Sequence, residues 1–216
     1  MNFEQARFNM VEQQIRPWEV LDPEVLDTLM TVQRERFVPE AFRNLAFADI
    51  AVPLPGGAAM LEPRLEAKVL QAVAPKKTDK VLEIGAGSGH MAALLAARAD
   101  WVRSIEIDPA LASFAAANLA AAGVENVIVE EGDGAAGWPE RAPYDVIVVS
   151  AGVTEVPKAM LEQLKPGGRL FAFVGSAPVM VGQLITCTGE GRYSTENLFE
   201  TLVPALRVPA KSAFSF

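Results

Sequence analysis

The most constraining feature of the sequence is a regular alternation of short apolar runs and helix-forming segments that begins at Lys80. The apolar runs have the length of buried strands, and alanine-rich segments separate them. The expected strands are 81–84, 101–105, 127–129, 145–149 and 169–174, and the expected helices are 90–98, 108–123 and about 156–164. Strands that alternate with helices predict a doubly wound, mostly parallel sheet in an α/β domain.

Both ends of the chain differ from this alternation. Segments 180–188 and 197–203 have strand character, and the short connection between them, around Gly189-Glu190-Gly191, predicts a terminal antiparallel hairpin. Residues 3–50 have apolar residues at helical spacing, and residues 51–63 form a loop rich in proline and glycine. The sequence thus predicts one domain over residues 1–216, with a helical N-terminal extension and loop in 1–63 and the α/β core in 64–216.

The chain contains one histidine, His90, and one cysteine, Cys187. One cysteine excludes an internal disulfide framework, and the two residues cannot supply a usual closed zinc site, so we expect no metal. A hydrolase triad would need His90 as its base, but His90 directly follows a glycine loop. The net charge of −8 disfavours nucleic acid as a partner. Without an apolar run of ~18 residues or a signal pattern, we expect a cytoplasmic protein and no membrane partner.

The glycine loop, Gly85-Ala86-Gly87-Ser88-Gly89, lies between the first expected strand and helix of the alternating region. Glycines let the backbone approach a ligand closely, and the start of the following helix offers N–H donors. A dinucleotide fingerprint, G-x-G-x-x-G, would place its third glycine at the position of His90. The observed G-x-G-x-G spacing, preceded by Glu83, favours S-adenosylmethionine over a nicotinamide cofactor. A glycine turn without a ligand is the structural alternative.

Acidic residues follow the next two strands, at the sheet edge where open α/β sheets bind ligands. Glu106 ends the second strand, where its carboxylate can accept hydrogen bonds from both ribose hydroxyls. Asp133 follows the third strand and could accept a hydrogen bond from an adenine amino group, although a simple Asx turn would also explain it. The candidate cofactor-binding residues are Glu83, Gly85, Ala86, Gly87, Gly89, His90, Glu106, Ile107, Gly132, Asp133 and Gly134.

With these motifs, the sequence resembles the class I S-adenosylmethionine-dependent methyltransferases, and among them the protein-L-isoaspartate O-methyltransferase family. Arg34–Pro39 is similar to the family's R-x-x-F-V-P segment, and Leu202-Val203-Pro204 resembles its closing F-V-P. Other similar segments are Met10–Ile15, Val81–Gly89, Gly132–Gly134, Pro143–Val148 and Gln163–Leu170. The resemblance implies a Rossmann-like fold. It also implies methyl transfer from S-adenosylmethionine to the carboxylate of an isoaspartyl residue in a protein or peptide, an activity of protein repair.

The resemblance breaks in residues 51–63, which we call the acceptor loop. Family members carry a T-I-S-Q-P-type segment whose serine is associated with catalysis, and alignment on Pro63 places Leu61 at the serine position. A carboxylate acceptor is already ionised at neutral pH, so a hydroxyl would orient it rather than activate it. Glu62 would repel a substrate carboxylate if it pointed into the site. The candidate acceptor-side residues are Leu61, Glu62 and Ser150, and the catalytic residue stays unassigned.

Four functions remain open on the sequence alone. The first is a carboxyl methyltransferase of the isoaspartate type, which the flanking segments favour. The second is a methyltransferase with a different, small-molecule acceptor. The third is a non-catalytic protein that binds S-adenosylmethionine, which the loss of the serine would permit. The fourth is a dehydrogenase, which the glycine spacing disfavours.

Overall fold

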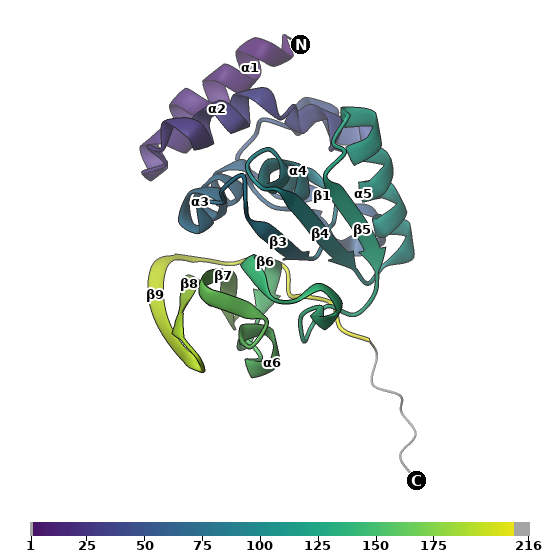
Figure 1. Cartoon of the computed structure of the whole chain (residues 1–216). Helices are drawn as coiled ribbons and strands as arrows, with labels where there is room; N and C mark the ends of the chain where they lie inside the picture. Colours follow the sequence, from purple (N-terminus) through teal and green to yellow (C-terminus); the bar gives the residue numbers. More distant parts are fainter. Residues whose placement is uncertain (1, 210–216) are drawn as a thin grey trace.

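The computed structural model describes residues 2–209, and its centre is a seven-stranded sheet (Figure 1). In spatial order the strands are β5 (Val127–Glu131), β4 (Trp101–Glu106), β3 (Lys80–Ile84), β6 (Tyr144–Val153), β7 (Leu164–Ser176), β8 (Val179–Gly189) and β9 (Arg192–Thr201). The first five run parallel, whereas β7, β8 and β9 pair antiparallel. The predicted mostly parallel sheet with a terminal antiparallel hairpin is therefore confirmed.

Three helices cover one face of this sheet. Their apolar side chains form a hydrophobic cluster with Val81, Val102 and Val146, which point to that face from three neighbouring strands. The longest of them, α5 (Pro109–Ala122), starts where the sequence predicts, because Asp108 caps it by accepting hydrogen bonds from two backbone N–H groups. The three helices are α3 (Pro63–Val73), α4 (His90–Ala96) and α5 (Pro109–Ala122).

The N-terminal extension is mostly helical, as expected. It contains α1 (Phe3–Met10) and α2 (Pro23–Thr31), which Figure 1 shows outside the helical layer, on the side away from the sheet. Buried residues such as Met10, Val25 and Phe37 belong to the same hydrophobic cluster as the strands, so the extension packs on the core. Among residues 2–209, no helix is long and apolar enough to span a membrane.

The expected helix over 156–164 is mostly absent, and this prediction was wrong in extent. Only α6 (Lys158–Leu161) is helical, and Leu164 already pairs with Tyr144 as the first residue of β7. The Gln163 side chain accepts a hydrogen bond from the Trp138 backbone and donates to two backbone carbonyls, which holds the chain in a turn. Pairing in the sheet therefore outweighs the local helical pattern.

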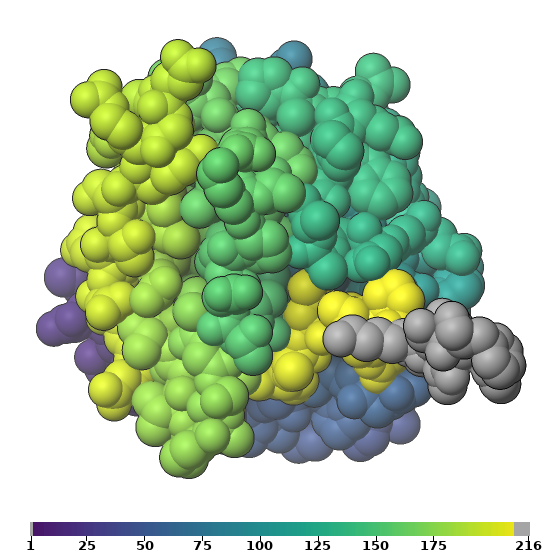
Figure 2. All heavy atoms as spheres, turned by 90° about the horizontal axis from the view of Figure 1, so that it is seen from below, coloured from purple at the N-terminus to yellow at the C-terminus, as the bar shows by residue number. Residues whose placement is uncertain are grey.

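Two segments from opposite ends of the sequence meet over the carboxyl ends of the parallel strands. The acceptor loop forms a small hairpin from β1 (Val52–Pro53) and β2 (Ala59–Met60). Residues 202–209, which we call the C-terminal strap, are fixed by Gly152, whose N–H donates to the Pro204 carbonyl at 2.8 Å and whose carbonyl accepts from the Leu206 N–H at 2.7 Å. Figure 2 shows the strap, in yellow, between the β6–β8 region and the N-terminal extension.

Candidate active site

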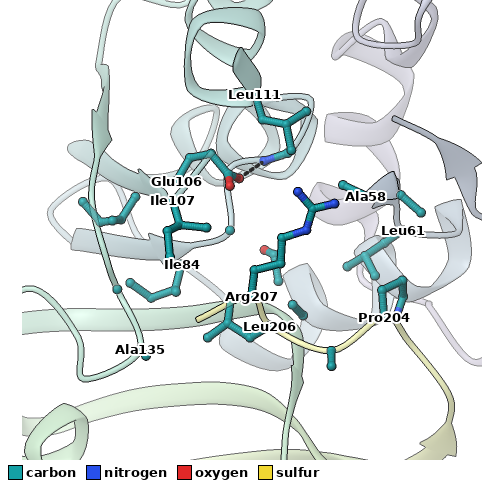
Figure 3. A pocket seen from close by; sticks show the side chains of 18 of the residues that line it. Ala58, Leu61, Ile84, Glu106, Ile107, Leu111, Ala135, Pro204, Leu206 and Arg207 are labelled. Carbon is teal, nitrogen blue, oxygen red and sulfur yellow. Dashed lines mark hydrogen bonds between the residues drawn. The ribbon is translucent and has the colours of Figure 1, made fainter. Parts of the chain in front are cut away.

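A cavity opens at the carboxyl ends of β3, β4, β5 and β6 (Figure 3). One wall is the glycine loop with the strand ends, and the opposite wall is the acceptor loop with the strap. From the first wall come Ile84, Gly85, Gly87, Ile105, Glu106, Ile107, Leu111, Gly132, Gly134, Ala135, Ser150 and Ala151; from the second come Gly57, Ala58, Ala59, Leu61 and Pro204–Arg207. Eight of the predicted site residues thus share one cavity: Leu61, Gly85, Gly87, Glu106, Ile107, Gly132, Gly134 and Ser150.

The glycine loop has the backbone that its sequence requires. Gly85, Gly87 and Gly89 have φ values of +92°, +52° and +84°, which disfavour residues with a Cβ. Gly89 does not line the cavity but caps α4, and a Cβ there would lie 3.0 Å from the Ala115 carbonyl oxygen. Gly89 therefore sets the close packing of α4 on α5, while Gly85 and Gly87 face the cavity.

Glu106 is held at the end of β4 by the backbone around it. Its Oε2 accepts a hydrogen bond from the Gly87 N–H at 2.9 Å, and its Oε1 accepts one from the Asp108 N–H at 3.1 Å. The residue is 6% exposed and lines the cavity. Its carboxylate is thus fixed in place before any ligand arrives, which is what recognition of ribose hydroxyls requires.

Glu83 lies deeper, in a small polar cavity that adjoins the first one and is also lined by Leu61, Ala86 and Ser150. The Ser104 hydroxyl donates to its carboxylate at 2.6 Å and the Ser150 hydroxyl donates at 2.9 Å. Burial raises the pKa of Glu83 to about 8, despite these hydrogen bonds. Glu83 therefore holds a proton at neutral pH until a cation comes near it.

This pKa predicts how stability changes with pH. The unfolded chain loses the Glu83 proton near its ordinary pKa of 4.5, whereas the folded protein keeps the proton up to about 8. The free energy of unfolding should therefore fall as pH rises from about 5 to about 8, by at most about 1.4 kcal/mol per pH unit from this group. Urea unfolding across this range should give a smaller decline for Glu83→Gln. Equal pH slopes for the two proteins would contradict the raised pKa.

Asp133 is exposed, and its Oδ1 accepts a hydrogen bond from the Ala135 N–H at 3.0 Å. This is the Asx turn that the sequence left open as the alternative. The carboxylate lies outside the residues that line the cavity, and its neighbours Gly132, Gly134 and Ala135 form the wall there. A Cβ at Gly134 would lie 2.7 Å from Ile84 Cδ1 and 2.9 Å from Ile84 Cγ2, so any larger residue there would require the Ile84 side chain to shift.

His90 points away from both cavities into a buried ionic cluster. Its Nδ1 lies 2.9 Å from Glu66 Oε2 and 3.2 Å from Arg34 Nη1, and its ring packs edge-on against Phe37. Burial lowers the pKa of His90, so the imidazole is neutral beside the Arg34–Glu66 ion pair. This position does not suit a general base for an acceptor in the cavity.

Arg34 links this cluster to the acceptor loop. Its guanidinium pairs with Glu66, donates from Nη2 to the Leu61 carbonyl at 2.6 Å and donates from Nε to the Ala46 carbonyl at 2.8 Å. Burial lowers the pKa of Arg34, and the pairing with Glu66 opposes that effect. Arg34 belongs to the R-x-x-F-V-P segment, but the spacing of residues within that segment does not indicate which distant residues Arg34 contacts.

Glu62 does not point into the site. Its Oε2 accepts two hydrogen bonds from Arg64, at 3.0 and 2.8 Å, and Arg64 also lies 3.2 Å from Asp49 and stacks over the Trp18 ring. Glu62 lines neither cavity, so the repulsion of a substrate carboxylate considered above does not arise from it. Leu61, by contrast, lines both cavities and is 7% exposed.

The strand order, the glycine loop after β3 and the carboxylate at the end of β4 define a Rossmann-like methyltransferase fold. The chain matches the family model of protein-L-isoaspartate(D-aspartate) O-methyltransferase over residues 5–206. The protein belongs to this family.

Similar proteins agree with this assignment. The protein-L-isoaspartate O-methyltransferase of Opitutus terrae is 46% identical over 179 residues, which are 81% of this chain and 77% of that protein. The one from Rhodopseudomonas palustris (strain CGA009) is 44% identical over 200 residues, covering 91% of both chains. A solved protein-L-isoaspartate O-methyltransferase has a TM-score of 0.79 at 27% identity, covering 92% of this chain and 65% of that one. A Plasmodium falciparum structure named for the same enzyme, solved with S-adenosyl-L-homocysteine, is similar in fold, with a TM-score of 0.79 at 17% identity and coverage of 96% and 99%.

Proposed function

We propose that this protein transfers a methyl group from S-adenosylmethionine to the carboxylate of isoaspartyl residues in proteins and peptides, in the cytoplasm. One observation carries the proposal beyond family membership: a single cavity has the glycine loop and Glu106 on one wall and the acceptor loop and strap on the other. A donor and an acceptor can therefore meet there. Because the extension and the sheet share one hydrophobic cluster, the chain would work as a single domain.

The residues around the cavity fit the donor. Glu106 offers a fixed carboxylate to the ribose hydroxyls, and Ile107 and Leu111 offer apolar surface to the adenine ring. The small cavity beside the glycine loop holds Glu83, which can ionise to meet the ammonium group of the methionine part. We assign Asp133, Gly89 and His90 to the support of this site rather than to contact with the donor.

S-adenosylmethionine, when bound, supplies a methyl group on a sulfonium sulfur, which a carboxylate oxygen takes as the C–S bond breaks and its electron pair stays on sulfur. No proton moves in this reaction, so the protein needs no general base for it. The chain contributes by holding the two reactants in line and by excluding water. Leu61, Pro204 and Leu206 give the acceptor side of the cavity an apolar wall that serves both purposes.

A different, small-molecule acceptor is the second candidate, because Leu61 presents no hydroxyl at the position of the family's serine. Incubation with S-adenosylmethionine labelled in its methyl group separates the two. Transfer to an isoaspartyl peptide, above controls without enzyme and with the matching aspartyl peptide, is expected. If no label is transferred while S-adenosylhomocysteine still binds, the isoaspartyl proposal fails and the second candidate remains.

Leu61→Ser is expected to raise the rate of methyl transfer to an isoaspartyl peptide several-fold, on the order of one added hydrogen bond. The new hydroxyl would lie in the cavity wall and could orient the acceptor carboxylate. The initial rate at a fixed peptide concentration is the measurement, with Leu61→Ala as the control for the change in side-chain volume. An equal rise in the rate for Leu61→Ser and Leu61→Ala would mean that the smaller side chain, and not the hydroxyl, causes the increase.

A further inference from the structure

The cavity has an electrostatic conflict that family membership does not explain. Glu106 lines it directly, whereas Glu83 in the small cavity beside it is protonated at neutral pH and Glu66 is paired with Arg34. The Glu106 carboxylate suits a donor that carries a positive charge, but it repels an acceptor that carries a negative charge. Leu61 offers no hydroxyl, and the Ser150 hydroxyl already donates its hydrogen bond to Glu83, so a cationic group on the acceptor side would favour the binding of a carboxylate there.

Arg207 is that group. Among the described residues that line the main cavity, it is the one Arg, Lys or His side chain. It extends from the C-terminal strap, and Figure 3 shows its guanidinium between Glu106 on one wall and Ala58 and Leu61 on the other. Its side chain is 36% exposed, so an incoming ligand can reach it.

The guanidinium is fixed in place but retains donors. Arg207 Nη1 lies 3.2 Å from Asp108 Oδ2, and Nη2 donates to the Gly56 carbonyl at 2.5 Å. Gly56 has a φ of +70°, and a Cβ there would lie 3.0 Å from the Asp108 carboxylate and 3.3 Å from Arg207 Nη1, so this contact needs glycine. Within residues 2–209 these two contacts occupy two of the five N–H groups of arginine.

The other two arginines near the acceptor loop, Arg34 and Arg64, do not line the main cavity. Arg64 is paired with Glu62 and Asp49 and is stacked on Trp18. Arg34 is 1% exposed and bonded to its own buried partners. Arg207 is therefore the guanidinium that a carboxylate entering between hairpin and strap would meet, and its planar donor group matches a carboxylate.

We propose that Arg207 binds the carboxylate that accepts the methyl group and so determines the specificity of the site for a negatively charged acceptor. The inference rests on the proposed function and deepens it. Arg207 replaces the orienting role of the hydroxyl that Leu61 lacks, and its contacts with Asp108 and Gly56 keep the guanidinium at the cavity while the acceptor enters.

The test compares two peptides of one sequence, one with an isoaspartyl residue and one in which the same carboxylate is a carboxamide. Their dissociation constants from the protein saturated with S-adenosylhomocysteine are measured by calorimetry. The unsubstituted protein should prefer the carboxylate peptide by about tenfold or more, as expected for a charged hydrogen bond. Arg207→Gln should bring the ratio to about one, Arg207→Lys should restore part of it, and Arg192→Gln, at an exposed arginine in β9, should leave it unchanged.

Affinity for S-adenosylhomocysteine alone should change by less than about twofold in Arg207→Gln. The proposal is overturned if Arg207→Gln keeps the preference for the carboxylate peptide. It is also overturned if both peptides and S-adenosylhomocysteine weaken in proportion, because Arg207 would then only hold the strap. Absence of methyl transfer by the unsubstituted protein would instead contradict the proposed function, whatever the two peptides show about Arg207.

Discussion

Glu106→Ala is expected to weaken the binding of S-adenosylhomocysteine by about a hundredfold, as measured by calorimetry. A charge-assisted hydrogen bond contributes about 1.5–3 kcal/mol, and the carboxylate can accept two from the ribose. The same substitution removes the acceptor of the Gly87 N–H, so the glycine loop also loses a constraint on its position. Glu106→Gln should have a smaller effect, because the amide oxygen of glutamine can still accept a hydrogen bond at the same position.

Glu131→Ala is the matched control for this prediction. Glu131 stands beside Glu106 in the register of β5 and β4, ends its strand in the same way and is exposed outside the cavity. Removal of the Glu131 carboxylate should change the affinity for S-adenosylhomocysteine by less than about twofold. Equal affinities for Glu106→Ala and the unsubstituted protein would contradict the proposed role of Glu106 in accepting hydrogen bonds from the ribose.

Glu66→Gln is expected to lower the free energy of unfolding by about 3–5 kcal/mol, the usual cost of removing one partner from a buried ion pair. Glu66 is 2% exposed and faces both Arg34 and His90. Burial favours the neutral acid, but the charge of Arg34 and the hydrogen bonds with Arg34 and His90 lower the pKa of Glu66, so it is ionised at neutral pH. Without this charge, the Arg34 guanidinium would be left buried and uncompensated.

Urea unfolding of Glu66→Gln tests this, with Glu12→Gln as the control. Glu12 pairs with Arg16 on the surface, where such pairs contribute about 0–1 kcal/mol. Arg34→Met combined with Glu66→Leu should be less destabilised than Glu66→Gln alone, because no charge is left buried. The recovery should be partial, since the Leu61 and Ala46 carbonyls would still lose their donor. A loss for Glu66→Gln as small as that for Glu12→Gln would contradict the ionic character of the cluster.

The placement of His90 is the clearest case in which sequence position misleads about a site. His90 directly follows the glycine loop, and this neighbourhood suggested contact with the donor. The first residue of α4, however, points its side chain to the helical layer, where it contacts Arg34 and Glu66, which are 56 and 24 residues away in the chain. Asp133 is the opposite case. The Asx turn that the structure shows is one of the two interpretations that its local sequence offers.

The sheet, the glycine loop and the strand-end carboxylate Glu106 could be predicted from the sequence, because they depend on local patterns: apolar runs, glycine spacing and the residue at which a strand ends. The tertiary structure was needed to show that Glu62 contacts Arg64 and that Arg34 donates to the Leu61 carbonyl. It alone brought Arg207 to Asp108 and Gly56, which lie 99 and 151 residues away in the chain. The spacing of residues specifies how a segment folds, but the partners of a long charged side chain depend on which distant segments the sheet brings to the same edge.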